Sequence, residues 1–170
     1  QAPGDLAVSV GEHLAVLRAI PGLRVLRPAD GEETNEAWLM ALEHGGPTVL
    51  ALTRQGLPTL EKADADWRQS MRRGAYVVQD VDSPEVVVVA TGSEVSMALD
   101  AAKESGRKVR VVSMPSRELF EAQDTTWQRS IAPAGVPVVV AEAGIRQGWE
   151  FLTTRDRILS IDRFGESGPG

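Results

Sequence analysis

The sequence lacks cysteine altogether, has only two histidines and contains no long apolar run. Without cysteine there can be no disulfide framework, thiolate metal site or cysteine nucleophile, which fits a reducing compartment. A bilayer-spanning helix needs about 20 apolar residues, and no basic segment followed by an apolar one opens the chain as an export signal would. These absences predict a cytoplasmic protein with no membrane partner.

Basic residues are also in deficit. The chain has 18 Lys and Arg against 24 Asp and Glu, with a formal net charge of -6 and a pI near 5.0. Nucleic acids and anionic membranes both recruit clustered Lys and Arg, so neither is an expected partner. With 170 residues, of which 42% are hydrophobic, the chain can bury a core and corresponds to one domain or two small ones.

The first sixty residues alternate between helical and extended patterns. A D-x-x-E pattern at Asp30 and Glu33 is suited to capping a helix, which then runs to about His44 and stops at Gly45-Gly46. The run Leu6–Val10 is compatible with a marginal strand or with a disordered tail. The other elements predicted here are a helix over Glu12–Ile20 and strands over Leu23–Arg27 and Pro47–Thr53. Strand, helix and strand at this spacing predict a right-handed βαβ unit with parallel strands.

A second alternating pattern follows residues 61–75, which are polar and charged around a single Trp67 and predict a linker holding one or two helical turns. Val86–Val89 is an unbroken β-branched run, typical of a strand buried on both faces. T-x-x-E at Thr91 and Glu94 predicts a capping box. The helix that follows is predicted to face the core with Val95, Ala98, Leu99 and Ala102. The remaining predicted elements are strands over Tyr76–Gln79, Glu85–Ala90, Val109–Ser113, Val136–Ala141 and Arg157–Ile161, and helices over Arg117–Phe120, Asp124–Ile131 and Ala143–Leu152.

These two patterns predict an α/β fold with two small open, mostly parallel sheets and flanking helices. We expect residues 1–60 to form the first domain, residues 61–75 the linker and residues 76–170 the second domain.

Arg54 is the candidate binding residue, because it follows the apolar run Val49–Leu52 in the stretch LALTRQGLPTL. In doubly wound folds, ligands bind in the crevice beyond the carboxyl ends of the strands, and a guanidinium matches the oxygens of a phosphate. Arg54 is therefore a candidate phosphate ligand, although most arginines at strand ends are solvated or paired with a carboxylate.

Two further strand ends carry polar groups. The turn Thr91–Glu94 could bind a phosphate at a helix N-terminus, but it has one glycine and Glu94 brings a negative charge, so capping is the favoured interpretation. Glu142 could act as an acid or base, yet Arg146 at i+4 favours a local ion pair.

Other candidates have less support. Asp80 and Asp82 have metal-like spacing without a third ligand, which favours a solvated loop. His44 lies in the last turn of a predicted helix, where its charged form would interact favourably with the helix dipole. His13 is expected to lie on the surface or to take part in packing. No G-x-S-x-G elbow supports a hydrolytic triad, so we assign no catalytic or metal-binding residue.

Several segments resemble the C-terminal part of transketolase, in that family's order and approximate spacing from Glu12 to Gly170. They read EHLAVLRAIPGLRVLRPAD, GPTVLALTRQGLP, ATGSEV, VRVVSMPSRELFEAQ, VVVAEAGI and FGESGPG. Related thiamine enzymes that make deoxyxylulose phosphate or decarboxylate pyruvate share the fold, but their segment before the linker does not usually read LTRQGLP. The resemblance implies that residues 1–60 are the C-terminal part of an incomplete pyrimidine-binding domain. Residues 76–170 would be most of the C-terminal domain, lacking its final helices.

The resemblance also implies an activity, the transfer of a two-carbon ketol unit between sugar phosphates. The family uses thiamine diphosphate with Mg²⁺ or Ca²⁺ and forms homodimers whose active sites lie between subunits. Arg54 aligns with the arginine that grips the substrate phosphate. The family's Glu-Asp-Gly-Pro-Thr-His-Gln-Pro segment, whose Asp and His contact the sugar, is replaced here by DLAVSVG at Asp5–Gly11, so neither role is carried over.

The groups that hold the cofactor in this family would lie upstream of Gln1. We therefore expect a transketolase fragment that binds no cofactor and is inactive alone, as a deliberately shortened chain, a proteolytic remnant or one chain of a split enzyme. It would need the missing N-terminal domains, or a second chain that carries them. The alternative is a non-catalytic α/β interaction or regulatory module that docks partner subunits or binds a nucleotide at Thr91–Glu94.

Overall fold

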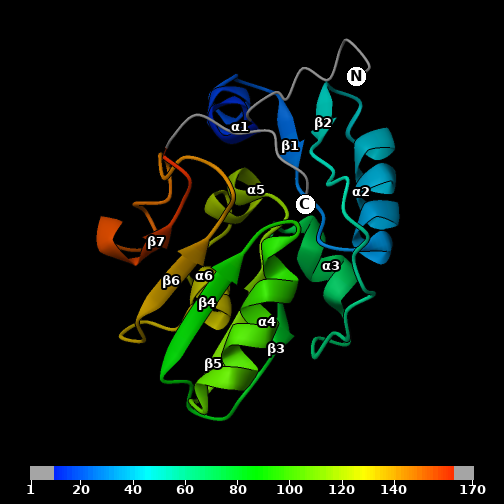
Figure 1. The fold of residues 1–170 in the computed structure, drawn as a ribbon. Coiled ribbons are helices and arrows are strands. Elements are labelled where there is room, and N and C mark those ends of the chain that lie inside the picture. The colour runs from blue at the N-terminus through cyan, green and yellow to red at the C-terminus, as the bar shows by residue number, and fades with distance from the viewer. Residues whose placement is uncertain (1–9, 163–170) are drawn as a thin grey trace, which may run out of the picture.

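The computed structural model describes residues 10–162, with side chains from residue 12 onward, as two open sheets with flanking helices (Figure 1). The predicted α/β class with two open sheets is confirmed. The first sheet is parallel and the second is mixed. Most of the Leu6–Val10 run and the C-terminal FGESGPG segment lie outside the described residues.

The first unit, residues 10–50, is the predicted βαβ unit preceded by a helix. Strands β1 (Arg24–Leu26) and β2 (Thr48–Leu50) pair in parallel through helix α2 (Gly31–His44), and α1 (Val10–Arg18) precedes them. The predicted caps of α2 are confirmed. Asp30 accepts a hydrogen bond from the Glu33 amide at 2.8 Å, and Gly45 closes the helix with φ 65°.

Strand β2 ends at Leu50, earlier than the predicted Thr53. Its only partner among the described residues is β1, which has three residues, so the ladder of backbone hydrogen bonds is short. Arg54 therefore lies four residues beyond the strand and not directly at its end.

The connecting segment, residues 51–75, contains helix α3 (Trp67–Arg72), as predicted. Trp67 and Met71 are buried although their neighbours are polar. The amides of Ala63 and Asp64 donate to the carbonyls of Val78 and Val77 at 2.9 and 3.3 Å, so the segment runs along the outer edge of the second sheet. It packs against both units and is not a free tether.

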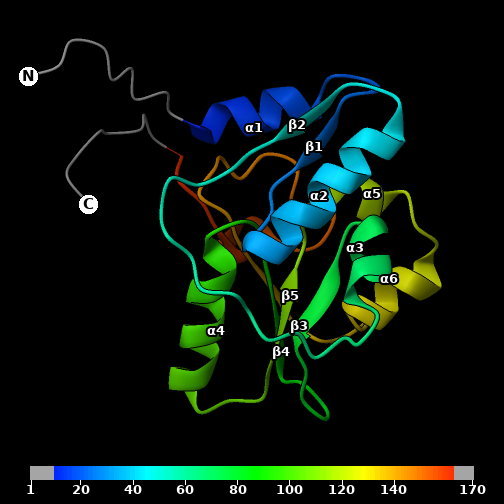
Figure 2. The same ribbon diagram turned by 90° about the vertical axis from the view of Figure 1, so that its right-hand side faces the viewer.

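The second sheet has the order β3-β5-β4-β6-β7, with β3 antiparallel to β5 and the other pairs parallel. Figure 2 shows α4 on one face and α5 and α6 on the other. Val87 and Val89 pack with Phe120 and Ile131, while Val88 contacts the cluster on the α4 side, so β4 is covered on both faces as predicted. The elements are β3 (Tyr76–Gln79), β4 (Val86–Ala90), α4 (Glu94–Ser105), β5 (Val109–Ser113), α5 (Arg117–Glu121), α6 (Thr125–Ile131), β6 (Val138–Ala141), η1 (Arg155–Arg157) and β7 (Ile158–Leu159).

The predicted helix over Ala143–Leu152 is wrong. This stretch is a series of turns, with Gly148 at φ 87°, and its Trp149 is fully buried. The Gly148 carbonyl accepts a hydrogen bond from Arg117 at 2.8 Å. The turns bury Trp149 while Phe151 stays exposed, so the apolar residues of the segment do not form one buried helical face. The strand predicted over Arg157–Ile161 is reduced to β7.

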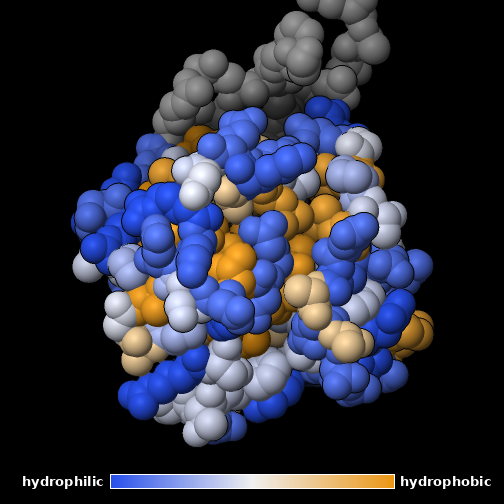
Figure 3. Space-filling model, turned by 90° about the horizontal axis from the view of Figure 1, so that it is seen from below, coloured by the Kyte–Doolittle hydropathy of each residue, from blue (hydrophilic) through white to orange (hydrophobic). Residues whose placement is uncertain are grey.

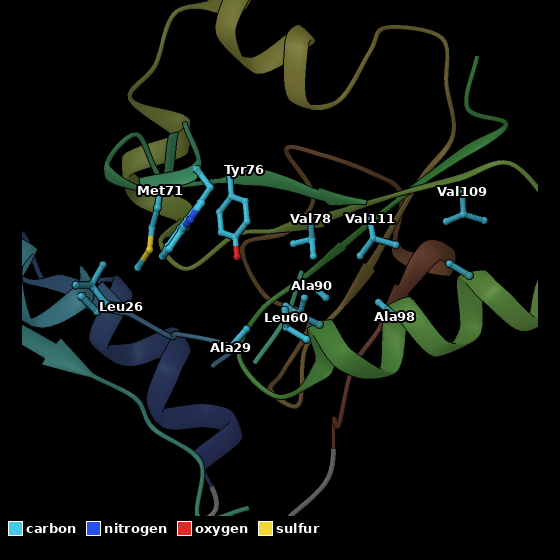
Figure 4. Close-up of a cluster of buried hydrophobic side chains, with 14 of the residues drawn as sticks. Leu26, Ala29, Leu60, Met71, Tyr76, Val78, Ala90, Ala98, Val109 and Val111 are labelled. Carbon is cyan, nitrogen blue, oxygen red and sulfur yellow. The ribbon is translucent and has the colours of Figure 1, made fainter. Parts of the chain in front are cut away.

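One apolar cluster is continuous across both units and the segment between them (Figure 4). Leu26 and Ala29 come from the first unit, Leu60 and Met71 from the connecting segment, and Tyr76 from the second sheet. The division into a first domain (1–60), a linker (61–75) and a second domain (76–170) stays a prediction, and this apolar cluster extends across both proposed boundaries.

The end of the molecule farthest from the first unit presents charged and polar side chains around an apolar area (Figure 3).

Gly74, between α3 and β3, offers a test of this packing. Its φ is 106°, and an added Cβ would lie 2.2 Å from the Phe120 amide nitrogen. Gly74→Ala should lower the free energy of unfolding by about 2–4 kcal/mol, from left-handed strain and overpacking, as measured by urea denaturation. Gly56→Ala is the control, because a Cβ there meets nothing within 4 Å. Equal losses in the two variants would contradict this account.

Candidate functional site

Arg54 lies in an exposed bend of the connecting segment. Within residues 10–162 its guanidinium makes no hydrogen bond or ion pair. A crevice of about 190 Å³ lies between the start of α2 and this segment. Thr53 and Gln55, the two neighbours of Arg54, line the crevice together with Gly31 and Thr34. The structure therefore leaves the predicted residue solvent-accessible beside a crevice, and no carboxylate of residues 12–162 competes for its charge.

Asp30 lines this crevice and links the start of α2 to the connecting segment. One carboxylate oxygen caps α2, and the other accepts hydrogen bonds from the Leu60 amide at 2.9 Å and from Lys62 Nζ at 2.7 Å. Burial would raise the pKa of Asp30, but the hydrogen bonds from Glu33, Lys62 and Leu60 outweigh it and the pKa is lowered. Asp30 is therefore held ionised. The sequence pattern indicated only its capping role.

Glu33, the second acid of the D-x-x-E pattern, has a role beyond the helix cap. Its carboxylate is fully buried and accepts hydrogen bonds from the Tyr76 hydroxyl at 2.6 Å, the Ser113 hydroxyl at 2.7 Å and the Ala29 amide at 2.8 Å. Burial raises the pKa of Glu33, against the lowering effect of the donors. Burial and the adjacent Glu33 charge raise the pKa of Tyr76. A side chain of the first unit thus binds two hydroxyls of the second sheet.

Glu142 pairs with Arg18 and not with Arg146. The two side chains are joined by two hydrogen bonds of 2.7 and 2.8 Å, and both are almost completely buried. Trp149 Nε1 and the Thr91 hydroxyl donate to the same carboxylate at 2.8 and 2.9 Å. Burial by itself would raise the pKa of Glu142, but the hydrogen bonds and the charge of Arg18 oppose this effect, and the net result is a lowered pKa. The i+4 pair does not form because the predicted helix is absent, and Arg146 pairs with Asp162.

The turn Thr91–Glu94 is filled from within the molecule. Arg27 of the first unit donates to the Thr91 carbonyl at 2.9 Å and forms an ion pair with Glu94. An added Cβ on Gly92 would lie 3.0 Å from the Arg27 side chain. Glu94 is the first residue of α4 and Ser93 its cap, so the predicted capping box is wrong.

This turn lies where β4 and β6 adjoin and the strand order reverses, the usual ligand crevice of a doubly wound sheet. Here Arg18 and Arg27 occupy the polar groups that a ligand would use. The sequence does not reveal that these two arginines fill the crevice, because each lies far along the chain from the residues that it contacts.

The other candidates take structural places. Asp80 accepts a hydrogen bond from Arg110 Nε at 2.8 Å, and His44 lies in the last turn of α2. Among residues 10–162, no three His, Cys, Asp or Glu side chains are grouped so that they could hold a metal ion. No helix of this region is long and apolar enough to cross a membrane.

Two family models match the chain. The transketolase pyrimidine-binding domain matches residues 7–59, and the transketolase-like C-terminal domain matches residues 74–170. The chain belongs to the transketolase family. A transketolase from Treponema pallidum is 53% identical over 162 residues, which are 94% of this chain and 24% of that protein. The chain thus spans about a quarter of the length of the curated transketolases it matches.

Solved transketolases have the same fold. The enzyme from Leishmania mexicana superposes with a TM-score of 0.85 at 45% identity, over 94% of this chain and 23% of that one. A Pichia stipitis transketolase in complex with sedoheptulose 7-phosphate gives 0.83 at 40% identity, over 93% and 23%. A split-gene transketolase, described as an inactive beta4 tetramer, gives 0.62 at 29% identity, over 78% and 43%.

The Arg18–Glu142 pair offers a test of the junction between the units. Arg18→Met should lower the free energy of unfolding by about 3–5 kcal/mol at neutral pH, because it leaves a buried carboxylate unpaired. Since the pKa of Glu142 is lowered in the folded state, the stabilisation is present above the unfolded pKa of about 4.3 and is lost as the pH falls toward the folded pKa. Urea titrations at several pH values measure this dependence.

Arg107→Met is the matched control, because Arg107 pairs with Glu85 on the surface. Its effect should stay below about 1 kcal/mol. A similar loss in both variants, or a loss for Arg18→Met that does not shrink in acid, would refute the role assigned to the buried pair.

Proposed function

We propose that this chain is the substrate-phosphate-binding and C-terminal part of a transketolase, which transfers a two-carbon ketol unit between sugar phosphates. Membership of the family supports the reaction class, and a sugar phosphate is bound in the Pichia stipitis relative. The observation that carries the proposal is the exposed guanidinium of Arg54 beside the crevice at the start of α2, which pairs with no side chain in the described part of the chain.

Arg54 binds and orients the phosphate of the donor or acceptor sugar in this proposal. A guanidinium without a carboxylate partner offers all of its donors to the phosphate oxygens. The negative charge of the ligand is then met by a permanent positive charge. We assign Arg54 no part in bond making or breaking.

The described residues do not fit the cofactor, thiamine diphosphate with Mg²⁺ or Ca²⁺. They contain no group of metal ligands, and the crevice of the second sheet is filled by Arg18 and Arg27. The cofactor is held instead by the region that the longer transketolases have and residues 1–170 do not match, supplied in the same polypeptide or by a second chain. The complete enzyme is a cytoplasmic homodimer in this proposal.

In this proposal the turn Thr91–Glu94 does not bind a regulatory nucleotide. A phosphate there would have to displace Arg27 and meet the carboxylates of Glu94 and Glu142. An interaction role remains part of the proposal, since the chain must associate with the cofactor-binding region.

Residues 1–170 alone should show no ketol transfer. The assay supplies xylulose 5-phosphate, ribose 5-phosphate, thiamine diphosphate and Mg²⁺, and product is measured with and without a chain that carries transketolase cofactor domains. Activity should appear only in the mixture. Turnover by residues 1–170 alone would contradict the proposed division of labour. The split-gene relative described as inactive supports the expectation.

Arg54→Ala in the assembled enzyme should raise the Michaelis constant for phosphorylated substrates. The lost charged hydrogen bonds correspond to about 1.5–3 kcal/mol in kcat/KM. Kinetics with unphosphorylated hydroxypyruvate should change little. Arg129→Ala, at an exposed arginine on α6, is the control. An equal effect of Arg54→Ala on both substrates would assign the residue a structural role.

A further inference from the structure

Arg54 sits between two anchors of the connecting segment. At the first, the Ala51 amide donates to the Leu26 carbonyl at 2.8 Å and continues the pairing of β1 with β2. At the second, the Leu60 amide donates to Asp30 at 2.9 Å, and the Leu60 side chain is buried in the same cluster as Ala29 (Figure 4). The residues between the anchors form neither helix nor strand, and most are exposed.

Lys62 closes the second anchor. Its ammonium donates to Asp30 at 2.7 Å, to the Leu60 carbonyl at 2.9 Å and to Glu32 at 2.8 Å. The side chain is only 5% exposed, and the ammonium lies 4.9 Å from the centre of the Trp67 ring. Both backbone polar groups of Leu60 are therefore held, the amide by Asp30 and the carbonyl by Lys62.

The two oxygens of Asp30 serve two elements. Oδ1 accepts from the Glu33 amide and fixes the start of α2, while Oδ2 fixes Leu60. Between the helix start and the segment lies the crevice of about 190 Å³, so side-chain packing does not fill this side of the segment. The position of Arg54 beside the crevice then depends on the anchors at Ala51 and Leu60.

We infer that Asp30 and Lys62 are positioning residues for the substrate phosphate, which hold the segment so that the Arg54 guanidinium meets it. This inference rests on the proposed function of Arg54. A displacement of about 1 Å at a binding group is enough to change rates by large factors. Loss of either anchor should therefore weaken phosphate binding without touching the reacting carbons.

Asp30→Ser and Lys62→Met separate positioning from folding. Serine still caps α2, but its single hydroxyl cannot also hold Leu60 and Lys62. Lys62→Met leaves the cap intact. In the assembled enzyme, each should raise the Michaelis constant for xylulose 5-phosphate about tenfold, less than the full loss of a charged hydrogen bond. Neither kcat nor the kinetics with hydroxypyruvate should change.

Asp100→Ser and Lys103→Met are the matched controls, because both residues are exposed on α4. Hydrogen exchange of the Leu60 amide should accelerate in Asp30→Ser and Lys62→Met and not in the controls. In the double variant Asp30→Ser/Arg54→Ala, the Michaelis constant should equal that of Arg54→Ala alone, since the anchor acts only through Arg54.

The outcomes separate the two proposals. If Arg54→Ala leaves the Michaelis constant for xylulose 5-phosphate unchanged, the proposed function fails and the anchor role falls with it. If Arg54→Ala raises it while Lys62→Met does not, the proposed function stands and the anchor role is overturned. Multiplying effects in the double variant, or unchanged exchange at Leu60, would also overturn it. Should Asp30→Ser not fold, Lys62→Met with Lys62→Met/Arg54→Ala decides.

Discussion

The junction of the two units depends on the rule that a carboxylate removed from water must be met by donors. Glu33 of the first unit receives the hydroxyls of Tyr76 and Ser113 from the second sheet. Glu142 of the second sheet receives Arg18 of the first unit. Each unit therefore buries an acid that receives side-chain donors from the other unit, in addition to donors of its own. Separating the units would take the two hydroxyls from Glu33 and the guanidinium of Arg18 from Glu142. These contacts therefore favour the arrangement in which the apolar surfaces of the two units form one continuous cluster.

Elements whose signals are local could be predicted from the sequence. Asp30 and Gly45 mark the ends of α2, and the inward face of α4 follows from helical spacing. The pairing of Arg18 with Glu142 could not be predicted, because 124 positions separate them and surface and buried acids look alike in a sequence. The helix expected over Ala143–Leu152 failed for a related reason. Burial of Trp149 against Glu142 outweighs the local helical pattern there.

The candidate site divides in the same way. The apolar run before Arg54, together with the family resemblance, was enough to single out that residue, and its binding role stays a prediction. The sequence overestimated the length of β2, because strand length depends on the partner available and β1 offers three residues. The second role of Asp30 was invisible, since it requires the chain to fold back and bring Leu60 and Lys62 beside the helix start. A capping pattern indicates where a helix begins, but not which distant segment packs against that position.

The backbone of Ala63 and Asp64 lies along β3 and consumes hydrogen-bonding groups on the outer side of that strand. An open sheet with a bare margin is a template for unwanted polymerisation. In the described part of the chain the opposite margin is β7, whose two residues offer little to a neighbouring molecule. The same stretch that leads away from Arg54 therefore also protects the second sheet from adding strands of other molecules at its β3 edge.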